Sequence, residues 1–231
     1  MEGVWRNREV PPALTGTTIV LDPGHNGGNA AHAREIARLV DAGTHRKACD
    51  TVGAQTARGY PEWAFTMDVA RRLARILRGA GARVVLTRTS SRGWGPCITR
   101  RAAIGNRARA AAAISIHADG GPAGGRGFHV IHPVRIRGLT DDIAAPSRRL
   151  AQAVRAAYRA GTGLPYATYV GGSGLVARSD LGGLNLSDVP KVFVEAGNMR
   201  NARDAALLSD PRFRERIARA LARGLDAFLG G

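Results

Sequence analysis

Residues 17–25 read TTIVLDPGH: five β-branched or aliphatic residues, followed at once by a charged residue, a proline, a glycine and a histidine. The apolar part, Thr17–Leu21, has the composition of a short buried strand. After a long connection, residues 61–79 carry apolar side chains at helical spacing with arginines on the other face, which predicts an amphipathic helix. Residues 83–87 (RVVLT) predict the next strand. A strand, a helix and a strand in this order are typical of a parallel pair in an α/β sheet.

The same alternation continues through the rest of the chain. Further strands are predicted at residues 113–116, 127–132 and 191–194, and further helices at residues 99–110, 143–159 and 213–229. We therefore expect residues 1–231 to form a single α/β domain, with a mostly parallel twisted sheet and helices on both faces. Two connections are long for such a domain. They are an insertion at about residues 26–60, which contains a helix-like stretch at 30–40, and a glycine-rich segment at 161–190.

The composition is that of a globular protein with a large excess of positive charge. Hydrophobic residues make up 44% of the chain, and 34 basic against 18 acidic residues give a formal net charge of +16. No apolar run approaches the roughly 20 residues of a membrane-spanning helix, and Met1–Val10 does not have the pattern of a signal peptide. We expect either an intracellular protein or the mature form of an exported one. Cys49 and Cys97 would be free thiols in the first case and one disulfide in the second.

The positive charge raises the question of a polyanionic partner. All but two of the basic residues are arginines, they are spread along the predicted helices, and aromatic residues are only 5% of the chain. This distribution argues against a nucleic-acid-binding protein. The arginines could instead lie on solvated helix faces, or they could attach the protein to anionic lipid or to acidic cell-envelope polymers.

Polar side chains follow three of the predicted strands. His25, His117 and Glu195 each stand at or just beyond a strand end, and the carboxyl ends of parallel strands share one edge of a sheet, where ligands bind. Glu62, at the start of the helix that follows the insertion, is positioned to join them. Two imidazoles and one carboxylate are a common ligand set for catalytic zinc, and a further carboxylate can act as a general base. The four residues therefore predict a zinc hydrolase in which Glu195 is the surplus carboxylate.

These residues also have structural interpretations. A single histidine at a strand end is more often a hydrogen-bonded structural residue than a metal ligand. Glu62 could be favoured only by the helix dipole, and Glu195 could form a buried ion pair with Arg101.

Other histidines offer alternatives of their own. His129 and His132 are three residues apart in one strand, so they point to opposite faces and are expected to be structural. His32 and Glu35, three apart on the helix-like stretch of the insertion, form a rival pair of metal ligands.

Four segments together resemble the zinc-dependent N-acetylmuramoyl-L-alanine amidases, and most of all the single-domain mycobacterial members of that family. The segments are IVLDPGH at 19–25, Glu62 at a helix start, SIHAD at 115–119 preceded by Arg101 and Asn106, and VEAGNMRN at 194–201. They cover nearly the whole chain in order.

The resemblance implies a phosphorylase/hydrolase-like α/β fold with one zinc ion held by His25, Glu62 and His117, and Glu195 as catalytic base. It implies hydrolysis of the amide between N-acetylmuramic acid and L-alanine of peptidoglycan stem peptides, in wall remodelling and daughter-cell separation. The further candidates for substrate binding or for support of the zinc ligands are Asp22, Arg101, Asn106 and Asn198. An exported, monomeric enzyme of the periplasm or cell wall is expected, with no nucleic-acid partner.

The chain also departs from the family pattern. The insertion between His25 and Glu62 is longer than usual, so the insertion could supply another ligand in place of Glu62, or gate the site. In an oxidising compartment we expect a disulfide between Cys49 and Cys97. No separate wall-binding module is expected, so attachment to acidic envelope polymers would depend on the arginine-rich surface.

Three rival functions remain at this point. A degenerate amidase fold could bind peptidoglycan without cutting it. A cytoplasmic nucleic-acid-binding protein would need no zinc and would bind with a steep salt dependence. A zinc peptidase would cut within the stem peptide instead.

Overall fold

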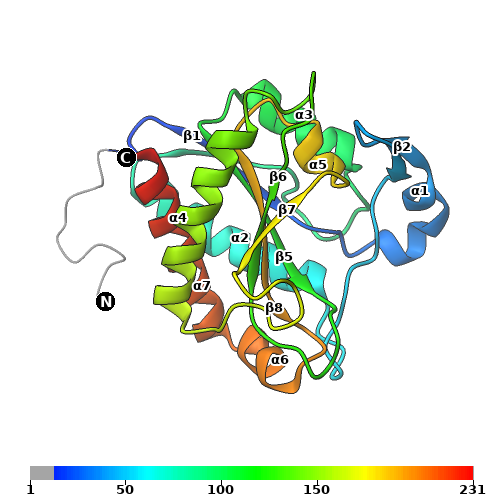
Figure 1. The fold of residues 1–231 in the computed structure, drawn as a ribbon. Helices are drawn as coiled ribbons and strands as arrows, with labels where there is room; N and C mark the ends of the chain where they lie inside the picture. The colour runs from blue at the N-terminus through cyan, green and yellow to red at the C-terminus, as the bar shows by residue number, and fades with distance from the viewer. Residues whose placement is uncertain (1–12, 231) are drawn as a thin grey trace.

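A six-stranded sheet runs through the centre of the computed structural model, which describes residues 13–230 (Figure 1). In the order of the sheet its strands are β4 (Arg83–Leu86), β1 (Thr18–Pro23), β5 (Ala112–Asp119), β8 (Lys191–Asn198), β6 (His129–Pro133) and β7 (Leu175–Arg178). The first four are parallel to one another, whereas β6 is antiparallel to β8 and parallel to β7. The predicted α/β class with a mostly parallel sheet is confirmed.

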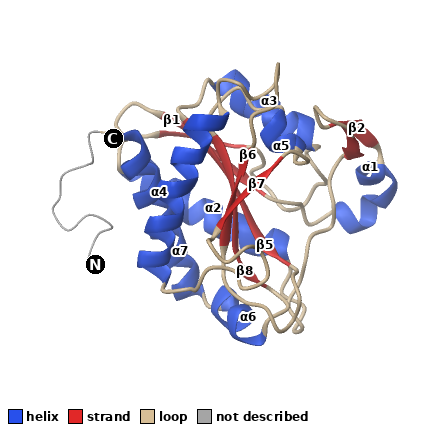
Figure 2. Ribbon diagram, in the orientation of Figure 1, coloured by secondary structure: helices blue, strands red, loops and turns tan. Residues whose placement is uncertain are grey.

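Helices cover both faces of the sheet, as predicted (Figure 2). On one face lie α2 (Glu62–Gly79), α4 (Ala144–Thr162) and α7 (Pro211–Leu229), whose apolar stripes form the main hydrophobic core with the strands. On the other face lie the shorter α3 (Ile98–Ala108) and α5 (Gly182–Asn185), which contact each other. Helix α6 (Ala202–Ser209) follows β8.

Alternation along the strands separates an apolar face from a polar one. In β5, Ile114 and Ile116 pack into the main core, and the residues between and after them, Ser115 and His117, point the other way. The same alternation holds in β8, where the side chains that face away from the core are those of Lys191, Phe193 and Glu195. The sheet therefore presents a row of mostly polar side chains on its α3–α5 side.

The insertion forms a small subdomain beside α3, at the blue end of the colour scale in Figure 1. It consists of a 3₁₀ turn (η1, Asn29–His32), the short helix α1 (Ala33–Ala37) and a hairpin of β2 (Leu39–Asp41) and β3 (Arg46–Ala48). The helix-like stretch expected at 30–40 thus ends at Ala37.

The predicted disulfide between Cys49 and Cys97 is present. It joins the end of the hairpin to the residue before α3, where the Ile98 N–H also donates to the Cys49 carbonyl at 2.9 Å. Residues 50–54, called the strap below, then lead from the disulfide back across the sheet edge toward α2.

The second long connection, at 161–190, contains strand β7 and helix α5, neither of which was predicted from the sequence. Polar side chains and main-chain groups join this segment to the insertion: Thr44 donates to the Ser179 carbonyl and Asn185 to the Ala42 carbonyl. In the described part of the chain, no helix is long and apolar enough to span a membrane.

Candidate metal centre

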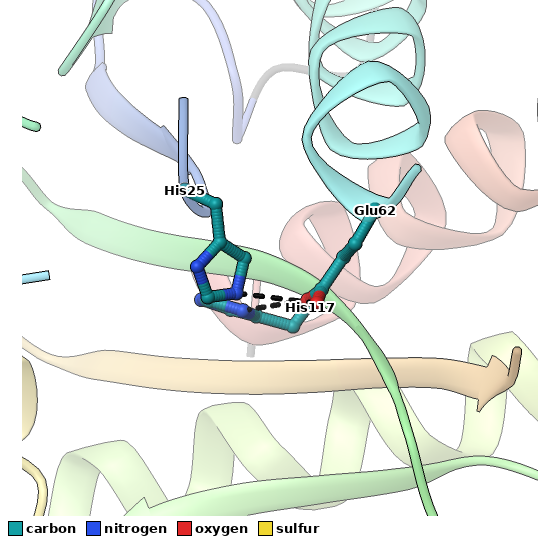
Figure 3. Close-up of side chains that lie close together, drawn as sticks. All are labelled: His25, Glu62 and His117. Atoms are coloured by element: carbon teal, nitrogen blue, oxygen red, sulfur yellow. Dashed lines mark hydrogen bonds and ion pairs between the residues drawn. The ribbon is translucent and has the colours of Figure 1, made fainter. Parts of the chain in front are cut away.

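Three side chains from separate elements meet at the edge of the sheet (Figure 3). His25 lies just beyond β1, Glu62 is the first residue of α2, and His117 lies in β5. Glu62 Oε2 is 3.2 Å from His25 Nε2, and Glu62 Oε1 is 3.0 Å from His117 Nδ1. One donor atom from each residue lies within 4.8 Å of the others, and within residues 13–230 this is the only group of its kind. The insertion does not displace Glu62 from the two histidines.

His25 is held in an unusual backbone conformation. Its φ of 54° lies in the left-handed region, which non-glycine residues rarely adopt. Arg101 donates to its carbonyl at 3.2 Å, and the Thr51 carbonyl lies 2.9 Å from Nδ1. Burial lowers the pKa of the imidazole, but the carboxylates of Glu62 and Asp50 outweigh burial and raise this pKa to about 10. Because His25 Nδ1 contacts the Thr51 carbonyl, His25 Nε2 is the nitrogen that faces Glu62 and His117.

Glu62 is kept ionised by its surroundings. Both carboxylate oxygens accept a main-chain N–H, Oε2 from Ala54 at 2.8 Å and Oε1 from Ala118 at 3.0 Å. Burial would raise its pKa, but the neighbouring His25 and His117 hold it well below the usual range. A buried carboxylate that accepts these hydrogen bonds stays negatively charged and can bind a cation.

His117 is positioned by close packing. Its ring stacks on Phe193 with centroids 5.0 Å apart. On the other side, a Cβ at Gly24 would lie 2.2 Å from His117 Cε1. The glycine of the DPGH segment is therefore required because the main chain passes directly against the His117 ring.

Asp22 forms a buried charge network beneath the site. Its carboxylate accepts from Arg101 at 2.8 Å and from Lys191 at 3.0 Å, and it is 1% exposed. Burial alone would raise the pKa of Asp22, but the two cations hold it well below the usual range. The suggested ion pair between Arg101 and Glu195 is wrong, because Arg101 is turned toward Asp22 and Asp50. Lys191 was missed, although a lysine opening the apolar run KVFV was a usable signal.

Glu195 lies beside His117, since the two are direct partners in the β5–β8 pairing. Its Oε2 is buried and has no hydrogen-bond partner among residues 13–230. Burial and the nearby Glu62 and Asp119 carboxylates raise the pKa of Glu195 well above its usual range. His129 is its neighbour on β6, where burial lowers the imidazole pKa to about 4, so that this histidine is neutral.

His25, Glu62, His117 and Glu195 line one cavity of about 390 Å³, together with Asp22 and Arg101. Two basic residues that were not singled out from the sequence also line it: Lys47 of the insertion hairpin and Arg178 at the end of β7. Both contact Asp180, at 3.6 Å for the lysine and 2.7 Å for the arginine Nε. The cavity thus has carboxylates at its floor and cations at its rim.

Comparison with known proteins identifies the family. Residues 19–227 match the family model Amidase_3, N-acetylmuramoyl-L-alanine amidase. The chain belongs to this amidase family. It is 42% identical to N-acetylmuramoyl-L-alanine amidase Rv3717 of Mycobacterium tuberculosis over 220 residues, 95% of this chain and 89% of that protein.

Solved structures agree with this assignment. The crystal structure of the amidase Ami1 from Mycobacterium smegmatis superposes with a TM-score of 0.88 at 42% identity, covering 94% of this chain and 98% of that one. AmiC2 of Nostoc punctiforme shares the fold, with a TM-score of 0.70 at 24% identity over 94% of this chain and 99% of that chain. The amidase fold is therefore shared well beyond the mycobacterial relatives.

Two of the candidate residues lie outside the cavity of this amidase. Asn106, on α3, donates to the Leu186 carbonyl and accepts from the Asp188 N–H, so it ties α3 to the segment after α5. Asn198, at the end of β8, donates to the carbonyls of Pro122 and Gly125. Neither lines the site, and both hold loops around it. The side-chain amides of both residues are bonded to main-chain groups of these loops.

The rival ligand pair on the insertion stays apart from the centre. His32 Nδ1 lies 3.2 Å from Glu35 Oε1, and both side chains are largely exposed. Among residues 13–230, neither joins the group of side chains that could hold a metal ion. By contrast, Asp22 and Arg101 line the cavity that holds His25, as expected.

Proposed function

We propose that this chain is a zinc-dependent hydrolase of peptidoglycan, in which His25, Glu62 and His117 hold zinc and Glu195 is the general base. The bond cleaved is the amide between the lactyl group of N-acetylmuramic acid and L-alanine of the stem peptide. The convergence of the three ligands beside Glu195 is the observation that carries the proposal, and membership of the amidase family supports the choice of bond.

The donor set fits zinc. Two imidazole nitrogens and one carboxylate oxygen are ligands that catalytic zinc commonly uses, and such sites keep their ligands oriented by further hydrogen bonds. Here His25 and Glu62 have those bonds already. Bound zinc would supply Lewis acidity, which polarises the scissile carbonyl and makes water acidic enough to react near neutral pH.

Glu195 would move the proton. Its unpartnered Oε2 accepts a proton from the attacking water as the water oxygen forms a bond to the carbonyl carbon. The same oxygen then gives the proton to the alanine nitrogen as the C–N bond breaks. The products are the lactyl carboxylic acid and the free amine of the peptide. General acid–base catalysis of this kind contributes about 10²–10⁴-fold.

The test is Glu195→Gln on a defined muropeptide, with Glu35→Gln as a control at an exposed glutamate of the insertion. We expect the first variant to retain one zinc by elemental analysis and to lose about 10²–10⁴-fold in turnover, while the control keeps both. Equal activity of wild type and Glu195→Gln would overturn the role of Glu195. No product from the zinc-loaded wild type would favour a binding module, and product masses showing cleavage within the peptide would favour a peptidase.

We further propose that the enzyme works outside the cytoplasm, as a monomer, in wall remodelling and daughter-cell separation. The disulfide and the cell-wall amidase family support export. The net charge of +16 would hold the enzyme on acidic envelope polymers. Sedimentation with purified walls should then fall as salt rises, because exposed charges are screened. Retention that is equal at low and high salt would overturn this attachment.

A further inference from the structure

The strap, residues 50–54, contacts two of the three side chains assigned to the metal. The Thr51 carbonyl lies 2.9 Å from His25 Nδ1, and the Ala54 N–H donates to Glu62 Oε2 at 2.8 Å. The strap belongs to the insertion and not to the sheet. His25, just beyond β1, and Glu62, the first residue of α2, are thus both supported by a segment that belongs to neither element.

Asp50 is the charged residue of the strap, and it lies behind His25. Its Oδ1 accepts the Thr51 N–H at 2.8 Å and is 3.5 Å from His25 Nδ1. Its Oδ2 accepts from Arg101 at 3.1 Å. Asp50 is 8% exposed, so these contacts are sheltered from water. The carboxylate therefore fixes the turn that presents the Thr51 carbonyl to the imidazole.

We propose that Asp50 is a positioning residue for the metal centre. Through the Asp50–Thr51 turn it keeps the proton of His25 on Nδ1 and directs Nε2 toward the metal. A metal-bound histidine is generally oriented by such an acceptor at its other nitrogen, and removing the acceptor costs about 10–100-fold in metal affinity. The inference rests on the zinc site of the proposed function.

Gly53 adds an independent steric constraint. A Cβ at this position would lie 2.7 Å from His25 Cδ2 and 2.9 Å from Glu62 Oε2. The strap thus packs against both ligands with no room for a side chain. Gly59 has a similar positive φ, 80° against 86°, but no atom within 4 Å of such a Cβ. Alanine would therefore strain the backbone at either position, but only at Gly53 would its Cβ also meet His25 and Glu62.

The first experiment measures zinc affinity by chelator competition in the full chain. Asp50→Ala removes the turn and the charge, whereas Asp50→Asn keeps an oxygen acceptor of the same shape. Asp41 provides matched controls, since its carboxylate likewise accepts a main-chain N–H, from Gly43 at 2.7 Å, but on the exposed hairpin. We expect Asp50→Ala to weaken zinc binding about 10–100-fold, Asp50→Asn to weaken it less, and Asp41→Ala and Asp41→Asn to leave it unchanged.

A spectrum separates positioning from a general loss of structure. With Co²⁺ in place of zinc, the visible absorption bands report on the ligand field, and we expect them to shift in Asp50→Asn but not in Asp41→Asn. Thermal unfolding of the metal-free variants checks that each one folds. If folded Asp50→Ala and Asp50→Asn bind zinc as tightly as the wild type with unchanged Co²⁺ bands, the inference is overturned.

The glycine pair provides the second test. Gly53→Ala should lose zinc affinity by about tenfold or more, the lower end of the range for a disturbed ligand support, and Gly59→Ala should not. Equal affinity in both variants would overturn the contact between strap and ligands. A wild-type protein that binds no zinc would overturn the proposed function itself, and this outcome differs from the one in which the wild type and all variants bind zinc alike.

Discussion

The six-stranded sheet and the insertion at residues 26–60 flank the same cluster of His25, Glu62 and His117, but they are stabilised by different kinds of contact. The strands and their covering helices bury a continuous apolar core. The insertion buries only three hydrophobic residues, Ile36, Ala42 and Cys49, and it exposes two large ones, Leu39 and Val52. Its order depends on a disulfide and on polar contacts to the rest of the domain.

The two regions therefore support different parts of the site. The sheet sets His117 and Glu195 side by side through strand register, so their spacing follows from the fold itself. The insertion supports His25 and Glu62 through the strap. We expect changes on the sheet side to lower the free energy of unfolding, and changes in the strap to lower metal affinity more than stability.

The largest stability effect is expected at Asp22, on the sheet side. Asp22→Ala leaves Arg101 and Lys191 buried without their shared partner, and breaking a buried ion pair in this way costs about 3–5 kcal/mol. Urea denaturation of the metal-free protein measures the change. Asp141→Ala is the control, because Asp141 pairs with the mostly exposed Arg135. A loss below about 1 kcal/mol at Asp22 would contradict this account, since that is the value of a surface pair.

The disulfide should contribute somewhat less. Cys49 and Cys97 are 48 residues apart in the sequence, and replacing both by serine frees this loop in the unfolded chain, for which a cost of about 2–4 kcal/mol is typical. Urea denaturation of the double variant gives the value, with oxidised and reduced wild type measured alongside. Unchanged stability would mean that polar contacts alone hold the insertion.

Acid provides a smaller, graded test that compares Asp22 with Asp50. The pKa of each carboxyl is lowered in the folded protein, against the effect of burial: by Lys191 and Arg101 for Asp22, and by His25 and Arg101 for Asp50. The ionised carboxylates of Asp22 and Asp50 stabilise the folded protein fully above the ordinary carboxyl pKa of 3.8. This contribution is lost as the pH falls toward the pKa of each group in the folded protein.

Between the ordinary pKa and the folded-state pKa, each such carboxyl lowers the free energy of unfolding by about 1.4 kcal/mol for every pH unit of acidification. The free energy of unfolding is measured on protein kept free of metal by a chelator, from about pH 5 downward through the ordinary carboxyl pKa. Its slope against pH should be shallower for Asp50→Asn than for the wild type. An identical slope would mean that the strap carboxylate is not linked to folding.

The smallest effect is expected at the rim, where the insertion meets β7. Asp180 pairs with Lys47 and Arg178, and all three side chains are substantially exposed. Asp180→Asn should therefore cost less than about 1 kcal/mol. A larger loss in urea denaturation would indicate that this contact, and not the disulfide, anchors the hairpin.

Helices and strands with a clear pattern of apolar residues could be predicted from the sequence. Helix α2 was identified because its apolar residues recur at intervals of three to four, and β1 because it is a short run of β-branched and aliphatic residues. The ends of parallel strands meet at one edge of a sheet, which is why the sequence pattern alone could bring His117 and Glu195 together. The same pattern placed His25 and Glu62 beside them, and the family resemblance supplied the identity of the bond that is cleaved.

The features that could not be predicted depend on contacts between segments far apart in the chain, which leave no pattern in the local sequence. Nothing in the residues around Asp50 indicates that its carboxylate lies behind His25, because the strap is placed by a disulfide and by Arg101, 51 residues away. Strand β7 is a four-residue strand within a glycine-rich segment, too short to show alternation. Asn106 was carried over from a motif, whereas its amide is used to hold a loop.

The scarcity of lysine in this chain leaves Lys47 as its one exposed lysine side chain. Of its two lysines, Lys191 is 2% exposed and paired with Asp22, whereas the Lys47 side chain is 37% exposed and lines the cavity. An amine-reactive fluorophore will attach to Lys47 and the α-amino group alone. Emission from that dye would report, without mutagenesis, when a glycopeptide enters.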